Sequence, residues 1–145
     1  MANATLTISS KNYSSWSLRG WLLCKMAGLD FEERQVAVDD INARRELLLA
    51  IAEYLNEIYP DAGILPSDRA VRAHCRAVSA EMHSGFYNLR SALPMNLKAR
   101  HKSFKVFSGA RPDVERIKEI WTECLNKYGG PYLFGNLSLA DAMYA

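Results

Sequence analysis

Residues 11–19 constrain the fold most, because within them a strand pattern gives way to a helix pattern. Before them, apolar and hydroxyl residues alternate over residues 5–8, which is the period of a half-buried strand. After them, apolar residues recur at helical spacing until Gly28. The pattern predicts a strand over residues 4–9 and a helix over residues 15–27, joined by a loop rich in hydroxyl groups.

A second strand is expected over residues 31–38, directly after that helix. A strand, a helix and another strand make a βαβ unit, in which the two strands run parallel and the connection is right-handed. The first part of the chain is therefore expected to be an α/β structure.

The residues after this unit predict helices on either side of a linker. Apolar residues at steps of three and four predict one amphipathic helix over residues 43–59, which ends before Pro60. Residues 60–68 are rich in Pro, Gly and Asp, which predicts a linker between two parts of the fold. A continuous apolar stripe over residues 71–93 then predicts a single helix of about 25 residues that stops at Pro94.

Two further helices are expected toward the end of the chain. The first starts near Pro112, ends at Gly129 and has an expected buried face made of Val114, Ile117, Trp121, Cys124 and Leu125. The second starts at a capping box, in which Ser138 bonds a backbone amide of the first turn and Asp141 returns the bond. The few residues after that box are too short to bury an apolar face, so we expect the full protein to continue.

Charge and cysteine content narrow the possible functions. Eighteen Lys and Arg and sixteen Asp and Glu give a formal net charge of +2, with both signs mixed along the chain, so nothing indicates nucleic-acid binding. The chain shows no signal-peptide pattern and no membrane-length apolar run, which favours a cytoplasmic protein. Cys24, Cys75 and Cys124 are spaced for neither a disulfide framework nor a zinc site, so we expect three small buried hydrophobes and no metal.

A basic stretch follows the long predicted helix. It contains Lys98, Arg100, His101, Lys102 and Lys105. Its simplest interpretation is a solvated connection between helices, and anion binding is the alternative.

Ser14, Ser15 and Ser17 lie where the first predicted helix begins. The free backbone N–H groups and the positive end of the helix dipole stabilise an anion there, such as a thiolate or a carboxylate. The alternative is that one of these serines only caps the helix, because Ser is favoured at an N-cap.

Three segments, in this order, resemble a bacterial glutathione S-transferase over nearly the whole chain. They are residues 12–19, residues 50–55 with the pattern Ala-Ile-x-x-Tyr-Leu, and the capping box at residues 138–141. The Ser-Ser-x-Ser-x-Arg pattern is most similar to the serine-using zeta-type enzymes, which include maleylacetoacetate isomerases. Trp16 stands where those enzymes commonly have Cys.

The resemblance implies an α/β thioredoxin-like N-terminal domain, residues 1–60, and an all-α C-terminal helical domain, residues 67–145, with the glutathione transferase fold incomplete. It further implies a cytoplasmic, homodimeric detoxification enzyme that uses glutathione as co-substrate and no metal. Such an enzyme conjugates a small hydrophobic electrophile, or isomerises a double bond through a transient thiol adduct. The alternative is a non-catalytic binding or regulatory protein of the same fold. Thiol–disulfide or peroxide chemistry is a third class, which Trp16 and the serines disfavour because it needs a Cys at the helix start.

The resemblance also implies which residues contact glutathione. A Ser hydroxyl is too weak an acid to act as a base, so it would donate a hydrogen bond to the sulfur anion. Ser14 is the first choice for this donor, Ser15 the second and Tyr13 the third, and Trp16 is expected beside them. Arg19 could add positive charge near the thiolate, although a surface Arg without a catalytic role is the simpler interpretation.

The hydrophobic co-substrate is expected between the two domains, against the long predicted helix. Met82, Phe86 and Tyr87 are the candidates to line its site, although a stripe of this kind also fits a packed core. His83 has no Cys or carboxylate at ligand spacing, so we expect it to be exposed or hydrogen-bonded rather than bound to a metal.

One part of the family pattern is absent. Family proteins carry two antiparallel strands between the second and third helices, and these strands hold the cysteinyl and γ-glutamyl parts of glutathione. Here residues 42–49 run directly into residues 50–53, without the Val-Pro and acidic-Ser pairs of such strands. Either the protein is shortened and has lost that part of the site, or segments of a longer protein are absent from this sequence; we favour the second.

Overall fold

The computed structural model of the 145-residue chain describes residues 4–35 and 51–145. Strands β1 (Ala4–Ile8) and β2 (Phe31–Gln35) pair in parallel, with Ala4 opposite Phe31 and Ile8 opposite Gln35. Helix α1 (Ser15–Met26) connects them. The predicted βαβ unit with parallel strands is confirmed, and residues 36–38 of the predicted second strand lie outside the described residues.

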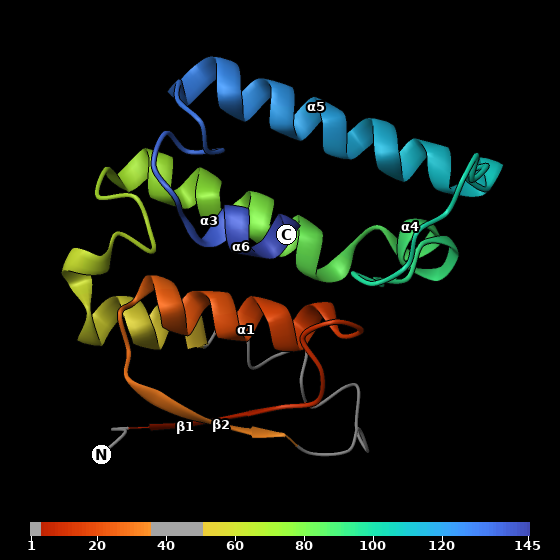
Figure 1. The fold of residues 1–145 in the computed structure, drawn as a ribbon. Coiled ribbons are helices and arrows are strands. Elements are labelled where there is room, and N and C mark those ends of the chain that lie inside the picture. Colours follow the sequence, from red (N-terminus) through yellow and green to blue (C-terminus); the bar gives the residue numbers. More distant parts are fainter. Residues whose placement is uncertain (1–3, 36–50) are drawn as a thin grey trace.

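Helix α1 forms the middle layer of the molecule (Figure 1). The β1–β2 sheet lies on one side of α1, and helices α3 (Arg69–Ser84) and α6 (Leu139–Tyr144) lie on the other. Helix α5 (Arg111–Tyr128) forms the outermost layer beyond α3 and α6. Because α1 is covered on both sides, several of its side chains are buried, among them Leu23 and Cys24.

The segment between the N-terminal and C-terminal helices is anchored in the core. Residues 51–58 are helical, and residues 43–50 of the helix predicted there lie outside the described part. A short 3₁₀ helix, η1 (Pro60–Ala62), follows, and then the buried side chains of Ile64 and Leu65. The backbone N–H of Leu139 at the start of α6 donates to the carbonyl oxygen of Ile64 over 2.7 Å. The predicted linker is therefore a packed connection.

The expectation of one helix of about 25 residues is wrong. Helix α3 ends at Ser84, and a separate short helix, α4 (Tyr87–Ala92), follows. Phe86 has the left-handed backbone angles φ 61° and ψ 38°, and a Cβ atom on Gly85 would lie 2.8 Å from the Glu81 carbonyl oxygen. The apolar stripe continues across this break, because Met82 and Phe86 are both buried, and its period therefore did not reveal the change of direction.

Helix α5 has the predicted ends, with Pro112 in its first turn and Gly129 at its C-cap with φ 64°. Its predicted buried face is only partly correct. Of the predicted residues, Cys124 is buried, Val114 and Ile117 are half-buried, and Trp121 and Leu125 are exposed; Ile120, which the pattern did not include, is buried. The reason is that α5 is the outer layer, so that only a narrow stripe of it faces the core.

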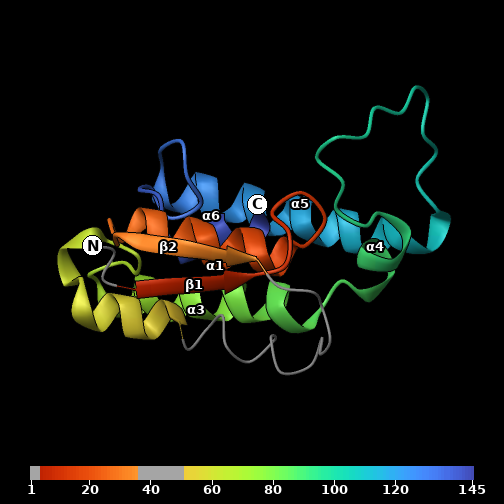
Figure 2. The ribbon, with the colours of Figure 1, turned by 60° about the horizontal axis from the view of Figure 1, so that its bottom comes forward.

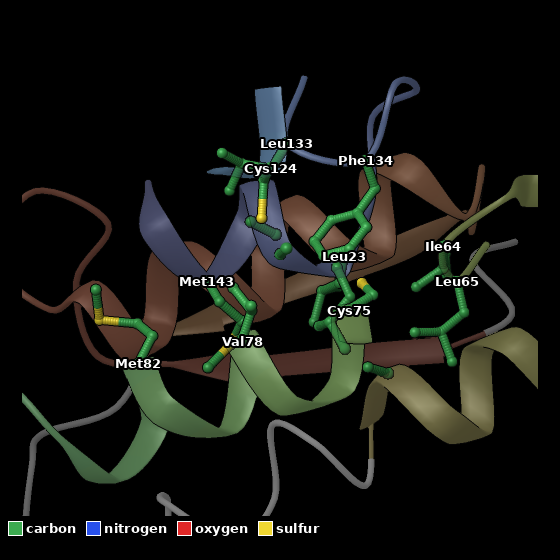
Figure 3. Packing of buried hydrophobic residues seen from close by; sticks show 14 of the residues in the cluster. Leu23, Ile64, Leu65, Cys75, Val78, Met82, Cys124, Leu133, Phe134 and Met143 are labelled. Carbon is green, nitrogen blue, oxygen red and sulfur yellow. The ribbon is translucent and has the colours of Figure 1, made fainter. Parts of the chain in front are cut away.

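The hydrophobic core joins all these helices (Figure 3). Side chains from α1, α3, α5 and α6 converge there with Leu133 and Phe134 of the segment that precedes α6. Cys24, Cys75 and Cys124 are buried and unpaired, which confirms the expectation of three small hydrophobes. Within residues 4–35 and 51–145, no helix is long and apolar enough to cross a membrane.

The predicted capping box at the start of α6 is confirmed. Asp141 Oδ2 accepts hydrogen bonds from the Ser138 N–H and the Ser138 hydroxyl, each over 2.9 Å. Its other oxygen, Oδ1, accepts from the Leu133 N–H over 3.0 Å. This carboxylate therefore holds the start of α6 against the loop before it.

Replacing Asp141 with Ala removes all three acceptor contacts from a partly buried region. We expect Asp141→Ala to lower the free energy of unfolding by about 2–3 kcal/mol, measured by urea denaturation. The control Glu57→Ala changes an exposed acid in a helix and should cost less than about 0.5 kcal/mol. Equal losses of unfolding free energy in the two variants would show that the capping box stabilises the protein no more than an ordinary exposed acid does.

Candidate functional site at the start of helix α1

Ser14 is the N-cap of α1. Its backbone is extended, with φ −129° and ψ 103°, and its Oγ accepts a hydrogen bond from the Ser17 N–H over 3.3 Å. Its own N–H donates to the Ser10 carbonyl oxygen over 3.1 Å. A hydroxyl has one proton and two acceptor lone pairs, so an Oγ that accepts from the backbone still has its proton to donate. Capping the helix and binding an anion are therefore compatible roles for Ser14.

Ser17 has a structural role that the sequence pattern did not reveal. Its buried Oγ accepts from the Ser9 N–H over 3.0 Å and lies 3.1 Å from the Ser9 Oγ. Ser9 directly follows β1, so this pair fixes the first turn of α1 against the end of the strand. We call Ser9 and Ser17 the serine pair.

The other two candidate donors lie on either side of Ser14. Ser15 is the first residue of α1 and is half-buried. Tyr13 precedes the cap and is 58% exposed. The geometry therefore puts three hydroxyl groups within three consecutive residues at the positive end of the α1 dipole.

Trp16 links α1 to the helical part of the fold. The rings of Trp16 and His83 lie nearly perpendicular to each other, with a centroid distance of 5.2 Å. The guanidinium carbons of Arg19 and Arg90 lie 5.1 Å and 5.4 Å from the centroid of the same indole. Arg90 also donates to the carbonyl oxygens of His83 and Met82. No sequence pattern marked Arg90, because its role depends on where α4 sits after the break at Phe86.

The expectation that Arg19 is a surface residue is wrong, since only 5% of its surface is exposed. Within the described part of the chain, its Nε and Nη1 atoms have no hydrogen-bond partner. Burial, reinforced by the nearby Arg90 charge, lowers the pKa of Arg19 to about 10. Arg19 is on the side of α1 that is covered by other elements. The residue type alone does not predict this, because Arg is mostly exposed in proteins.

The three residues expected to line the co-substrate site have different environments. Met82 and Phe86 are buried in the core cluster, and Tyr87 is 77% exposed. The Met82 sulfur lies 3.7 Å from Arg90 Nη2, which connects it to the surroundings of Trp16. The structure thus brings Met82 toward the start of α1 and leaves Tyr87 in solvent.

A loop distant in sequence is also hydrogen-bonded to the residues just before Ser14. The Leu97 N–H donates to the Asn12 carbonyl oxygen over 3.3 Å. Asn12 lies two residues before Ser14, so the segment after α4 borders the loop that carries the hydroxyl groups. Sequence spacing gave no indication of this contact.

The cysteines are unsuited to nucleophilic chemistry. Burial raises the pKa of the Cys24 and Cys75 thiols, and it raises that of Cys124 to about 11. A thiol reacts as its thiolate, so a raised pKa suppresses the reactive form. In residues 4–35 and 51–145, no group of His, Cys, Asp or Glu side chains is arranged to hold a metal ion.

The burial of Arg19 leads to a test of stability. Two of the guanidinium nitrogens of this buried cation have no hydrogen-bond partner among the described residues, so replacing it with an apolar side chain of similar length removes a desolvation cost. We therefore expect Arg19→Met to raise the free energy of unfolding by about 1–2 kcal/mol, after allowance for the lost contact with Trp16. The measurement is urea denaturation, with Arg34→Met on the exposed part of β2 as control. A loss of more than about 1 kcal/mol in Arg19→Met alone would contradict this view of Arg19.

Comparison with known proteins identifies similar chains. No protein-family model matches the sequence. A probable maleylacetoacetate isomerase of Caenorhabditis elegans is 45% identical over 94 residues, which are 64% of this chain and 44% of that protein. The chain thus spans less than half the length of this curated relative.

Solved structures show the same fold over almost the whole chain. A glutathione transferase homologue from Burkholderia, solved with bound glutathione, matches with a TM-score of 0.64 and 26% identity, over 97% of this chain and 76% of that one. A maleylacetoacetate isomerase from Anaeromyxobacter dehalogenans matches with a TM-score of 0.61 and 22% identity, over 96% and 71% of the two chains. The expected fold, a thioredoxin-like part followed by helices, is confirmed. In fold and in sequence the chain is thus similar to glutathione transferases and to a maleylacetoacetate isomerase.

Proposed function

We propose that this chain is the glutathione-activating part of a glutathione transferase. The observation that carries the proposal is the geometry of Ser14, whose Oγ accepts from the Ser17 N–H and keeps its proton for an acceptor outside the helix. The Burkholderia homologue was solved with bound glutathione, which supports glutathione as the ligand.

The chemistry follows from the location of that hydroxyl. The thiol of glutathione is mostly protonated at neutral pH, and only its thiolate is a good nucleophile. Ser14 donates a hydrogen bond to the sulfur anion, while the α1 dipole and the buried Arg19 charge make the surroundings more positive. The thiol proton leaves to solvent, and the thiolate attacks an electrophilic carbon of the second substrate. As the new carbon–sulfur bond forms, the bond to the leaving group breaks, and the leaving group, a halide in the case of an aryl halide, departs with the electron pair.

Within the family, we assign the chain to the serine-type, zeta-like enzymes. The worm relative's name, probable maleylacetoacetate isomerase, supports isomerisation as well as conjugation. In isomerisation the thiolate adds to a double bond, the resulting single bond rotates, and elimination returns the thiolate. Trp16 replaces the Cys of the zeta pattern, and its indole packs against Arg19, Arg90 and His83. Conjugation of a hydrophobic electrophile is therefore the broader form of the proposal.

The remaining assignments are part of the same proposal. Residues 1–60 form the glutathione-binding domain and residues 67–145 the helical domain, in a cytoplasmic homodimer. Tyr13, Ser15 and Trp16 lie around the bound tripeptide beside Ser14. The second substrate lies against the end of α3 and the start of α4, where Met82, Phe86 and Tyr87 are found.

The role of Ser14 can be separated from its role as a helix cap. We expect Ser14→Ala to lower kcat/KM for glutathione conjugation by about 100-fold, because the variant cannot donate to the thiolate. Ser14→Thr keeps both the cap and the hydroxyl proton and should retain activity within about tenfold. The measurement is steady-state conjugation of a chromogenic aryl halide, with glutathione retention on an affinity matrix as a binding readout.

Ser84→Ala is the matched control, since Ser84 is exposed at the end of α3. It should leave both readouts unchanged. Full activity in Ser14→Ala would defeat the assigned role. Failure of the unaltered protein to bind glutathione at all would instead favour a non-catalytic binding protein with the same fold.

A further inference from the structure

Basic residues are concentrated in one part of the chain. Residues 82–112 contain six of the eighteen Lys and Arg and none of the sixteen Asp and Glu. Their formal net charge is +6, against −4 for the rest of the chain. The expectation that the two signs are mixed along the whole sequence is therefore wrong for this segment.

The centre of this segment is a loop that joins α4 to the 3₁₀ helix η2 (Ser108–Ala110). Residues 97–107 of it, which we call the basic–apolar loop, contain no helix or strand. Five of its side chains are basic and exposed: Lys98, Arg100, His101, Lys102 and Lys105. The whole connection between α4 and η2, residues 93–107, has no helix or strand, and connections of this length without regular structure are uncommon in compact domains and often have a function.

Apolar side chains of the same loop also face solvent. Phe107 is 63% exposed and Phe104 is 55% exposed, and Leu97 and Val106 are exposed as well. Four large apolar side chains in eleven residues are costly to keep in water. Figure 2 shows the loop as the teal trace that extends away from the helices beyond α4 and α5.

The loop also borders a hollow of about 330 Å³ against α4. Phe104, Phe107 and Ala92 supply apolar walls, and Lys105 and Asn88 supply polar groups. Apolar walls next to a cationic side chain suit a ligand that has a hydrocarbon part and an anionic part.

We propose that the basic–apolar loop docks on an anionic lipid surface. Lys and Arg near such a surface are attracted to its negative charge, while Phe, Leu and Val enter the boundary between headgroups and acyl chains. The absence of any carboxylate from residues 82–112 leaves this attraction unopposed within the segment. Aliphatic Leu97 and Val106 have no stacking role toward nucleic acid, and they favour a lipid surface over that alternative.

Docking at this loop has a consequence for the rest of the molecule. The loop is bonded to the corner before α1, through the Leu97 N–H and the Asn12 carbonyl oxygen. When the basic–apolar loop docks, the loop before Ser14 therefore lies on the side of the protein that faces the membrane. The docking itself does not depend on glutathione binding, so the two proposals can fail separately.

The test is co-sedimentation of the 145-residue chain with lipid vesicles. We expect binding to vesicles that contain one third phosphatidylserine in phosphatidylcholine, weaker binding at high salt, and no binding to phosphatidylcholine alone. The double variant Lys102→Glu/Lys105→Glu should lose at least about tenfold in affinity. Phe104→Ser/Phe107→Ser should lose a similar factor, because it removes the apolar part of the contact.

The matched control is Lys118→Glu/Lys127→Glu, which makes the same change of net charge on exposed residues of α5. It should stay within about threefold of the unaltered protein. Circular dichroism of each variant verifies that it is folded. No binding to phosphatidylserine vesicles, equal binding to phosphatidylcholine, or an equal loss in the control would overturn the proposal. So would binding to single-stranded nucleic acid or to an acidic polypeptide without binding to vesicles.

Discussion

The hydrogen bonds between Ser9 and Ser17 are the interaction on which the candidate site depends. They join the end of β1 to the first turn of α1, so the strand and the helix have a fixed relative position. Ser14 lies inside this closed loop, and its hydroxyl is oriented by the Ser17 N–H. Because the serine pair is buried, water does not compete for its hydrogen bonds. The site is therefore defined by the junction of a strand and a helix.

The layer arrangement explains why a cation lies beneath this junction. Helix α1 is covered by the sheet on one side and by α3 and α6 on the other, so its second turn faces protein rather than solvent. Arg19 is buried there, and its guanidinium and that of Arg90 both lie against the indole of Trp16. Two positive groups on one indole, beside the positive end of a helix dipole, make this corner suited to an anion. The basic–apolar loop is joined to the residues before this junction by the hydrogen bond from the Leu97 N–H to the Asn12 carbonyl oxygen.

Sequence patterns predicted most of the secondary structure but not the packing around the candidate site. The strand–helix–strand unit, the ends of α5 and the Ser138 capping box follow from local signals and agree with the structure. The break at Gly85 and Phe86 could not be predicted from the apolar period, because the buried positions continue across it. The burial of Arg19 and the position of Arg90 depend on tertiary packing, which no local pattern encodes.

We propose that the start of α1 stabilises the glutathione thiolate through the Ser14 hydroxyl. The most direct measurement is the ultraviolet absorbance of the thiolate of bound glutathione as a function of pH, in the unaltered protein and in Ser14→Ala. In the unaltered protein, the pKa of the bound thiol should lie at least about one unit below that of free glutathione, and Ser14→Ala should return it most of the way. A bound thiol that titrates like free glutathione in the unaltered protein, or identically in both proteins, would contradict the claim.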